Sequence, residues 1–243
     1  YINYLSQIVL GNDKNAKAKD MSTLFSVTSI SNNPFSISLR GECNITPKNT
    51  DAYYIDSKIK GDNVSDYEYG VEYNENNTRL LMNRLSSFQG AEFLMKQRVR
   101  DTGTVSINVS ENDMRLIGTV TNTLGYALNN CMIYYQGNLL YIGDIEKGET
   151  IDVNKYAKSG TYNSSDYGNS VNSMIESAMG GNMYSNSMAA SLRRKVGVVE
   201  EYLEDNSNAK AWFYGFVSDD TKTGFRDKFN YDLYGVTGVC RNF

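Results

Sequence analysis

Hydrophobic and polar residues alternate along much of the chain up to Val153. The segments Tyr67-Glu-Tyr-Gly-Val-Glu-Tyr73 and Val105-Ser-Ile-Asn-Val109 show this period of two most clearly. Successive side chains of a strand point to opposite faces, so the pattern predicts strands with one buried face. The same pattern predicts further strands at 5–10, 23–30, 35–39, 53–60, 78–85, 114–120, 128–135, 139–142 and 150–153.

Short polar segments separate these predicted strands and indicate turns. Ser31-Asn-Asn-Pro34 lies between two of them and predicts a hairpin of segments 23–30 and 35–39. Asn74-Glu-Asn-Asn77 predicts another turn. Gln136-Gly-Asn138 predicts a tight hairpin turn, because Gly and Asn both tolerate positive φ. Antiparallel strands at such close spacing are typical of an immunoglobulin-like sandwich.

The pattern changes after Asn154. Residues 156–169 are rich in Ser, Tyr, Gly and Asn and predict an exposed loop, and 170–179 predict a short helix. A longer helix is expected at 185–204, where an apolar stripe has helical spacing: Met188, Leu192, Val196, Val199 and Leu203. Strands then resume at 210–217 and 229–234.

These elements predict a mainly β chain with two immunoglobulin-like β-sandwich domains. The expected N-terminal domain covers 1–100, and the expected second domain covers 101–243 with a helical insertion at about 170–205. The net charge of −4 has no concentrated basic face, which argues against a nucleic-acid-binding protein. The one basic cluster, Arg193-Arg-Lys195, is interpreted as the solvated face of the helix, and an anion site is the alternative.

The three cysteines, Cys43, Cys131 and Cys240, leave two interpretations open. They lie far apart with no Cys-x-x-Cys spacing, and the chain has no His, so a zinc site is not expected. One disulfide and one free thiol could form. We favour the interpretation that the three cysteines are buried separately as apolar side chains, because free Cys is often buried.

Catalytic chemistry finds little support in the residue types. Without His, a Ser or Cys nucleophile lacks its usual base. The spacing of Ser191 and Lys195 is better explained by a structural helix face. The acidic pairs Glu200-Glu201 and Asp219-Asp220, and the calcium candidates Asp62, Asp66 and Glu68, are interpreted as solvated turn and helix residues. The sequence therefore predicts no enzyme, no catalytic residue, no cofactor and no metal.

Several segments resemble a repeated pattern in uncharacterised multi-pass membrane proteins of Gram-positive bacteria. The strongest are Leu116 to Asn130, with its Gly-x-Val-x-Asn sequence, and Ile142-Gly-Asp-Ile-Glu-Lys-Gly-Glu149. Further likeness lies at Tyr1 to Ser6, Tyr134 to Gly137 and Leu192 to Leu203. The resemblance implies β-sandwich modules on the extracellular face of the membrane, anchored through spanning helices in flanking segments absent from this chain. It implies no activity, and this chain departs from the pattern at 163–187.

The function we expect is a non-catalytic ectodomain that binds or scaffolds a protein partner or a cell-wall glycan at the cell envelope. The abundance of Tyr, Asn, Ser and Gly suits adaptable polar contacts, and the segment 156–187 is the expected contact surface. A carbohydrate-binding or carbohydrate-active cell-wall module is the alternative, since exposed Tyr rings can stack on sugars. A structural spacer is a third hypothesis.

Overall fold

The chain is mainly β, as the alternating pattern predicted. The computed structural model describes residues 1–11, 18–48, 67–74, 77–87, 90–100, 103–112, 115–135, 138–155, 160–161, 195, 198–199, 211–218, 224–225 and 233–243. Its strands are β1 (Ile2–Val9), β2 (Ala18–Thr28), β3 (Phe35–Arg40), β4 (Cys43–Pro47), β5 (Tyr67–Asn74), β6 (Asn77–Leu85), β7 (Gly90–Arg100), β8 (Val105–Asn112), β9 (Arg115–Asn122), β10 (Leu128–Tyr135), β11 (Asn138–Ile145), β12 (Thr150–Asp152), β13 (Gly160–Thr161), β14 (Ala211–Val217) and β15 (Leu233–Asn242). A short 3₁₀ helix, η1 (Val153–Lys155), follows β12.

The chain divides into two compact units that are not continuous in sequence. Unit 1 consists of 1–6, 20–98 and 223–235, and unit 2 of 7–19, 99–222 and 236–243. Strands β1, β2, β7 and β15 each contribute residues to both units. The expected division after residue 100 places each strand in one domain only. Alternation of polar and apolar residues shows which face of a strand is buried, but it does not show that one strand belongs to two units.

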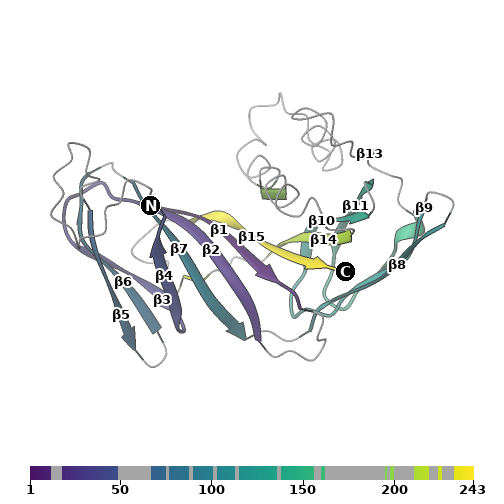
Figure 1. The fold of residues 1–243 in the computed structure, drawn as a ribbon, viewed down its shortest axis with the longest axis horizontal. Helices are drawn as coiled ribbons and strands as arrows, with labels where there is room; N and C mark the ends of the chain where they lie inside the picture. Colours follow the sequence, from purple (N-terminus) through teal and green to yellow (C-terminus); the bar gives the residue numbers. More distant parts are fainter. Residues whose placement is uncertain are drawn as a thin grey trace. The chain divides into compact units, whose positions relative to one another are not determined.

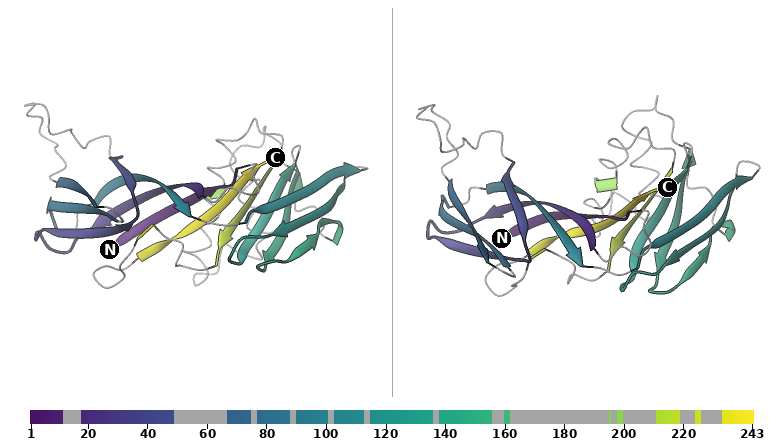
Figure 2. Two further views of the ribbon diagram at one scale, coloured as in Figure 1. Left: turned by 90° about the horizontal axis from the view of Figure 1, so that it is seen from below. Right: turned by 60° about the horizontal axis from the view of Figure 1, so that its bottom comes forward.

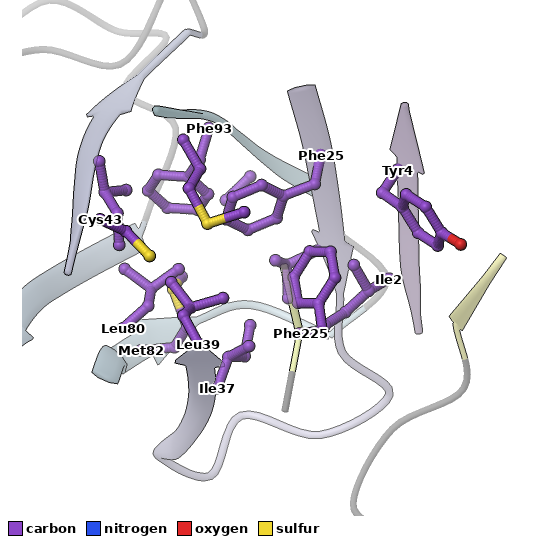
Figure 3. Packing of buried hydrophobic residues seen from close by; sticks show 14 of the residues in the cluster. Ile2, Tyr4, Phe25, Ile37, Leu39, Cys43, Leu80, Met82, Phe93 and Phe225 are labelled. Carbon is purple, nitrogen blue, oxygen red and sulfur yellow. The ribbon is translucent and has the colours of Figure 1, made fainter. Parts of the chain in front are cut away.

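In unit 1, side chains from two sheets form one hydrophobic core. One sheet has the order β3-β6-β5, and β1, β2, β7 and β4 are neighbours in the other. Figure 1 shows β3, β5 and β6 side by side, and Figure 3 shows the rings of Phe25, Phe93 and Phe225 gathered in the core. The Phe25 ring lies 5.5 Å from Phe93 and 5.2 Å from Phe225, centroid to centroid. Burying each such ring stabilises the fold by about 1.5–3 kcal/mol.

The predicted hairpin of 23–30 and 35–39 is wrong, although both segments are strands. β2 lies between β1 and β7, whereas β3 pairs antiparallel with β6, from Phe35 opposite Met82 to Arg40 opposite Asn77. The turn at Ser31 to Pro34 therefore carries the chain from one sheet to the other. Ile37 and Leu39 of β3 are fully buried in the shared core. The turn residues look alike in both arrangements, so the sequence did not distinguish them. The strands predicted on either side of Asn74 to Asn77, by contrast, pair with each other as β5 and β6.

Unit 2 contains the sheet β12-β9-β8 and the neighbouring strands β13-β11-β10-β14-β15. In Figure 2 the teal strands β10 and β11 lie beside the yellow-green β14. Residues 211–216 of β14 are all buried, as expected for a strand that is covered on both faces. Trp212 stacks on Tyr134, which stands opposite it in β10, with 5.2 Å between ring centroids and 11° between ring planes. The hairpin predicted around Gln136 to Asn138 is confirmed by the β10–β11 pairing.

A buried amide organises the connection from β9 to β10. Asn122 has no exposed surface, and its Nδ2 donates hydrogen bonds to the carbonyl oxygens of Tyr126 (2.9 Å), Ile145 (3.2 Å) and Glu146 (3.3 Å). Its Oδ1 accepts from the backbone N–H of Leu124 at 3.0 Å. The end of β9, the loop that follows it and the end of β11 are therefore held by one side chain.

Gly118 allows β8 and β9 to approach each other closely. Its φ is +126°, and a Cβ built there would lie 2.0 Å from the carbonyl oxygen of Asn108. Side chains of L-residues rarely adopt this φ, so only glycine fits both the backbone and the space. The Gly-x-Val-x-Asn sequence thus has a physical reason, since Val120 between them is also fully buried.

The C-terminal third differs from expectation in one strand position. Residues 211–217 form β14, and β15 (Leu233–Asn242) includes 233–234 of the strand expected at 229–234, whose residues 229–232 lie outside the described ones. Pairing with β14 determines this position, from Trp212 opposite Asn242 to Phe216 opposite Gly238. Strands β4 and β7 were not predicted. Of the predicted helix at 185–204, the structure describes Lys195, Val198 and Val199, whose backbone is helical; the rest, the short helix at 170–179 and the strand at 53–60 lie outside the described residues.

Candidate functional site

A bulge in β10 creates the most concentrated set of interacting polar side chains in the described part of unit 2. The register of β10 shifts between Leu128 and Met132, against both β11 and β14. Within this bulge Asn130 has a φ of +49°, the one positive φ of a non-glycine residue in the described ranges. Asn adopts this conformation more readily than other residues, because its short side chain bonds locally. Opposite the bulge, Gly143 of β11 also has a positive φ, +75°.

Asn130 is bound on three sides. Its backbone N–H donates to Asp144 Oδ1 at 2.8 Å, and its Nδ2 donates to the hydroxyl oxygen of Tyr141 at 3.0 Å. Its Oδ1 accepts a hydrogen bond from Lys195 Nζ at 2.6 Å. We call Asn130, Tyr141, Asp144 and Lys195 the bulge cluster. Two of its members, Tyr141 and Asp144, come from β11, and Lys195 comes from far along the sequence.

Lys195 also contacts strand β14. Its Nζ lies 5.2 Å from the centroid of the Phe216 ring, close enough for a cation–π interaction. Asn130 and Phe216 are thus both covered by the same half-buried side chain. Loss of water favours the neutral amine, whereas the amide oxygen and the ring face favour the ammonium.

Burial and neighbouring charges shift the protonation of this cluster. Burial lowers the pKa of Lys195, while the charge of Asp144 opposes that shift. Burial raises the pKa of Tyr141, which the hydrogen bond from Asn130 opposes and the charge of Asp144 reinforces. The adjacent Cys131 thiol has its pKa raised well above the usual range, by burial and then by Asp144, with Lys195 acting in the opposite direction. The phenol and the thiol therefore stay protonated at neutral pH.

The sequence interpretation of the basic cluster is wrong for Lys195. A solvated helix face was expected, but Lys195 is half-buried and bonded to Asn130. Arg193, Arg194 and Ser191 lie outside the described residues. The sequence reasoning also missed Asn130, Tyr141 and Asp144. A signal was present, because Asn129-Asn130 interrupts an otherwise apolar strand, as a bulge with positive φ requires.

Two buried cations form a second polar feature of unit 2. Lys19 Nζ donates to the carbonyl oxygen of Gly103 at 2.7 Å, and Arg241 donates through Nη1 to the carbonyl oxygen of Val105. Burial lowers the pKa of Arg241. These side chains anchor the segment that enters β8 to β2 and β15, a structural role.

The cysteines follow the favoured interpretation. Cys43, Cys131 and Cys240 are free and buried. The Cys43 thiol lies 3.0 Å from Gln97 Oε1, and burial raises its pKa to about 11. Cys240 Sγ accepts a hydrogen bond from Gln7 Nε2 at 3.2 Å. Each thiol thus sits in a separate packed environment, and the pKa shifts of Cys43 and Cys131 are opposite to those of reactive cysteines.

The other candidate residues come together in no site that the structure describes. Glu68 is exposed on β5, whereas Asp62, Asp66, Glu200, Glu201, Asp219 and Asp220 lie outside the described residues. Within the described ranges, no group of three acidic or Cys side chains could hold a metal ion. No described helix has the length and apolar character that a membrane span needs. The expected contact surface at 156–187 has only Gly160 and Thr161 described, as β13.

The comparison with known proteins gives one family. No curated protein and no solved structure matches the chain. The family described as "Domain of unknown function (DUF8725)" matches residues 104–233, a range that contains Gly118, Asn122 and the whole bulge cluster. Because the match covers more than half of the sequence, the chain belongs to the DUF8725 family.

Proposed function

We propose that the chain is a non-catalytic ectodomain on the outer face of the cell membrane, where it binds or scaffolds a partner at the cell envelope. We further propose that each unit is an immunoglobulin-like β-sandwich, the second carrying a helical insertion. Antiparallel sheets joined by short turns support this proposal, because they present strand faces and loops to a partner. The partner is a protein or a cell-wall glycan, and membrane-spanning segments outside this chain anchor the region.

The observation that carries the proposal is the bonding within the bulge cluster. A catalytic base or nucleophile needs a reacting proton or atom within hydrogen-bond reach of a substrate. Asn130 instead uses its backbone N–H, Nδ2 and Oδ1 on Asp144, Tyr141 and Lys195. The shifted groups beside it, the Tyr141 phenol and the Cys131 thiol, are held in their protonated, unreactive forms. These interactions support a structural role for the cluster.

The environment of the thiols is compatible with a location outside the cytoplasm. Thiolates are the species that oxidise, and burial keeps the pKa of Cys43 and Cys131 high. All three thiols are buried, so the chain withstands an oxidising compartment without forming disulfides.

Labelling of an introduced cysteine tests the location. Tyr73 is 62% exposed on β5, so Tyr73→Cys places one reactive thiol on the surface of a chain whose own thiols are buried. In intact cells that make the full-length protein, a membrane-impermeant maleimide is expected to label this variant and not the wild type. Labelling that requires cell lysis would contradict the proposed location.

Binding needs a separate measurement. The purified chain is added to intact cells that lack the protein and to purified cell-wall glycan. Saturable binding to cells or to glycan is expected, and binding should be lost when the chain is unfolded beforehand. Absence of saturable binding to both would contradict the proposed binding role.

A further inference from the structure

The contact between Lys195 and Asn130 brings together the two functional groups of an amide exchange. Lys195 Nζ is 2.6 Å from Asn130 Oδ1, across 65 residues of sequence. A carbonyl bond is about 1.23 Å long, so Nζ lies within about 3.8 Å of the carboxamide carbon Cγ. Reacting atoms in near-attack geometries are about 3–3.5 Å apart, which a small rotation of the lysine side chain reaches.

Hydrogen bonds within the cluster fix the orientation of the Asn130 carboxamide. Tyr141 accepts from Nδ2, so the opposite edge of the amide, with Oδ1, faces Lys195. Asp144 binds the backbone N–H of the same residue and fixes the bulge. Such preorganisation replaces the encounter of two separate molecules, and oriented intramolecular reactions reach effective concentrations on the order of 10⁵–10⁸ M. Tyr141 is thus a positioning residue.

The Lys195 amine can act as a nucleophile once it loses its proton. Burial favours its neutral form, and the carboxylate of Asp144 is near enough for its charge to act on Lys195. A neutral amine carries the lone pair that an ammonium lacks. Asp144 also accepts the hydrogen bond of the Asn130 N–H, and we assign it as the group that takes the proton from Lys195 Nζ.

We propose that Lys195 and Asn130 form an intramolecular isopeptide bond in the folded chain. Asp144 takes one proton from the Lys195 ammonium, and the lone pair of Nζ forms a bond to Asn130 Cγ. A second proton passes from Nζ to Nδ2, the Cγ–Nδ2 bond breaks, and ammonia leaves, taking up the proton held by Asp144. One ammonium and one carboxamide become one secondary amide and one ammonium ion. No oxidant, metal or external reactant is needed.

This bond would fasten the Lys195 segment to β10 permanently. A cross-link between residues 65 apart restricts the unfolded chain, as a disulfide does, and it does so without depending on the redox state of the compartment. The inference does not depend on the location or the partner proposed above, so its test is independent of theirs.

Intact-mass spectrometry of the purified, folded chain tests the proposal. The wild type is expected to be lighter than its sequence by the mass of one ammonia, and proteolysis should give a branched peptide that joins Lys195 to Asn130. On a denaturing gel it should migrate faster than an uncross-linked variant, because the closed loop cannot extend. Asp144→Asn and Tyr141→Phe should each slow the loss of ammonia.

Two variants and one control make the result specific. Lys195→Arg removes the nucleophile, and Asn130→Gly removes the carboxamide while tolerating the φ of +49°. Both are expected to keep the full sequence mass. Lys147→Arg, at an exposed turn in the same unit, should lose ammonia like the wild type.

Two results would overturn the proposal. One is a wild-type chain that keeps its full sequence mass after prolonged incubation in the folded state. The other is a loss of ammonia that persists in Lys195→Arg and yields only linear peptides, since Asn130 would then have cyclised onto its own backbone. The first result needs only the wild-type chain. The second needs one variant, Lys195→Arg, to fold.

Discussion

Asn122 Nδ2 lies 3.2 Å from the carbonyl oxygen of Ile145, and this hydrogen bond joins the end of β9 to the end of β11. The backbone adds to it, because Asn122 N–H donates to Glu149 and Gly148 N–H donates back to Asn122. The two segments that carry the strongest sequence resemblance, 116–130 and 142–149, are therefore neighbours in space. Their residue pattern reflects one packed junction in unit 2.

Removing the Asn122 carboxamide should destabilise unit 2. Asn122→Ala leaves three carbonyl oxygens and the Leu124 N–H without their partner in a buried site. We expect the free energy of unfolding to fall by roughly 2–4 kcal/mol, measured by denaturant unfolding. Asn108→Ala, at an exposed position of β8, is the control and should change it by less than about 0.5 kcal/mol. Equal effects of the two substitutions would contradict the proposed junction.

Gly118 should be intolerant of any side chain. In Gly118→Ala the new Cβ meets the carbonyl oxygen of Asn108 at 2.0 Å, with a φ that disfavours alanine. A loss of about 3 kcal/mol or more is expected from strain and displaced strands. Gly125→Ala is the matched control, because no atom lies within 4 Å of its Cβ position. If both variants unfold at the same denaturant concentration, the claim that Gly118 is needed for the close approach of β8 and β9 is contradicted.

The sequence predicted strands well and pairings less well, for a physical reason. Alternation in segments such as Asn77–Leu85 coincides with alternating burial of the side chains, and β5 and β6 pair as their turn indicates. Alternation does not show which strand pairs with which. A hairpin was therefore predicted for β2 and β3, although they belong to different sheets. The bulge cluster escaped prediction because it depends on register. Only the shift at Asn130 brings β11 and Lys195 to the same side chain.

The buried thiols predict that the cysteines stay unreactive until the chain unfolds. A thiol reagent added to the native chain at neutral pH should modify no cysteine, because all three are buried and thiolate formation at Cys43 and Cys131 is suppressed. After denaturation, all 3 cysteines should react. Fast modification of the native chain, or fewer than three reactive thiols in the unfolded one, would contradict this picture.

The Cys43 thiol predicts a loss of stability at alkaline pH. Its pKa rises from 9.0 to about 11 in the folded chain, so its contribution to stability is complete below pH 9.0 and is lost as pH rises toward about 11. Cys43→Ser keeps a hydrogen-bond donor for Gln97 without a group that titrates in this range. Unfolding experiments at about pH 8 and about pH 10.5 should show a larger loss for the wild type than for Cys43→Ser. Parallel losses would show that Cys43 does not titrate as proposed.

The central claim is that Lys195 serves as a structural fastener of the β10 bulge. Amide hydrogen exchange of Asn130 tests it most directly, since this N–H bonds to Asp144 only while the bulge is held in place. In Lys195→Met, we expect the Asn130 amide to exchange at least about tenfold faster than in the wild type, while the Thr119 amide of β9 keeps its rate. Unchanged exchange at Asn130 would contradict the claim.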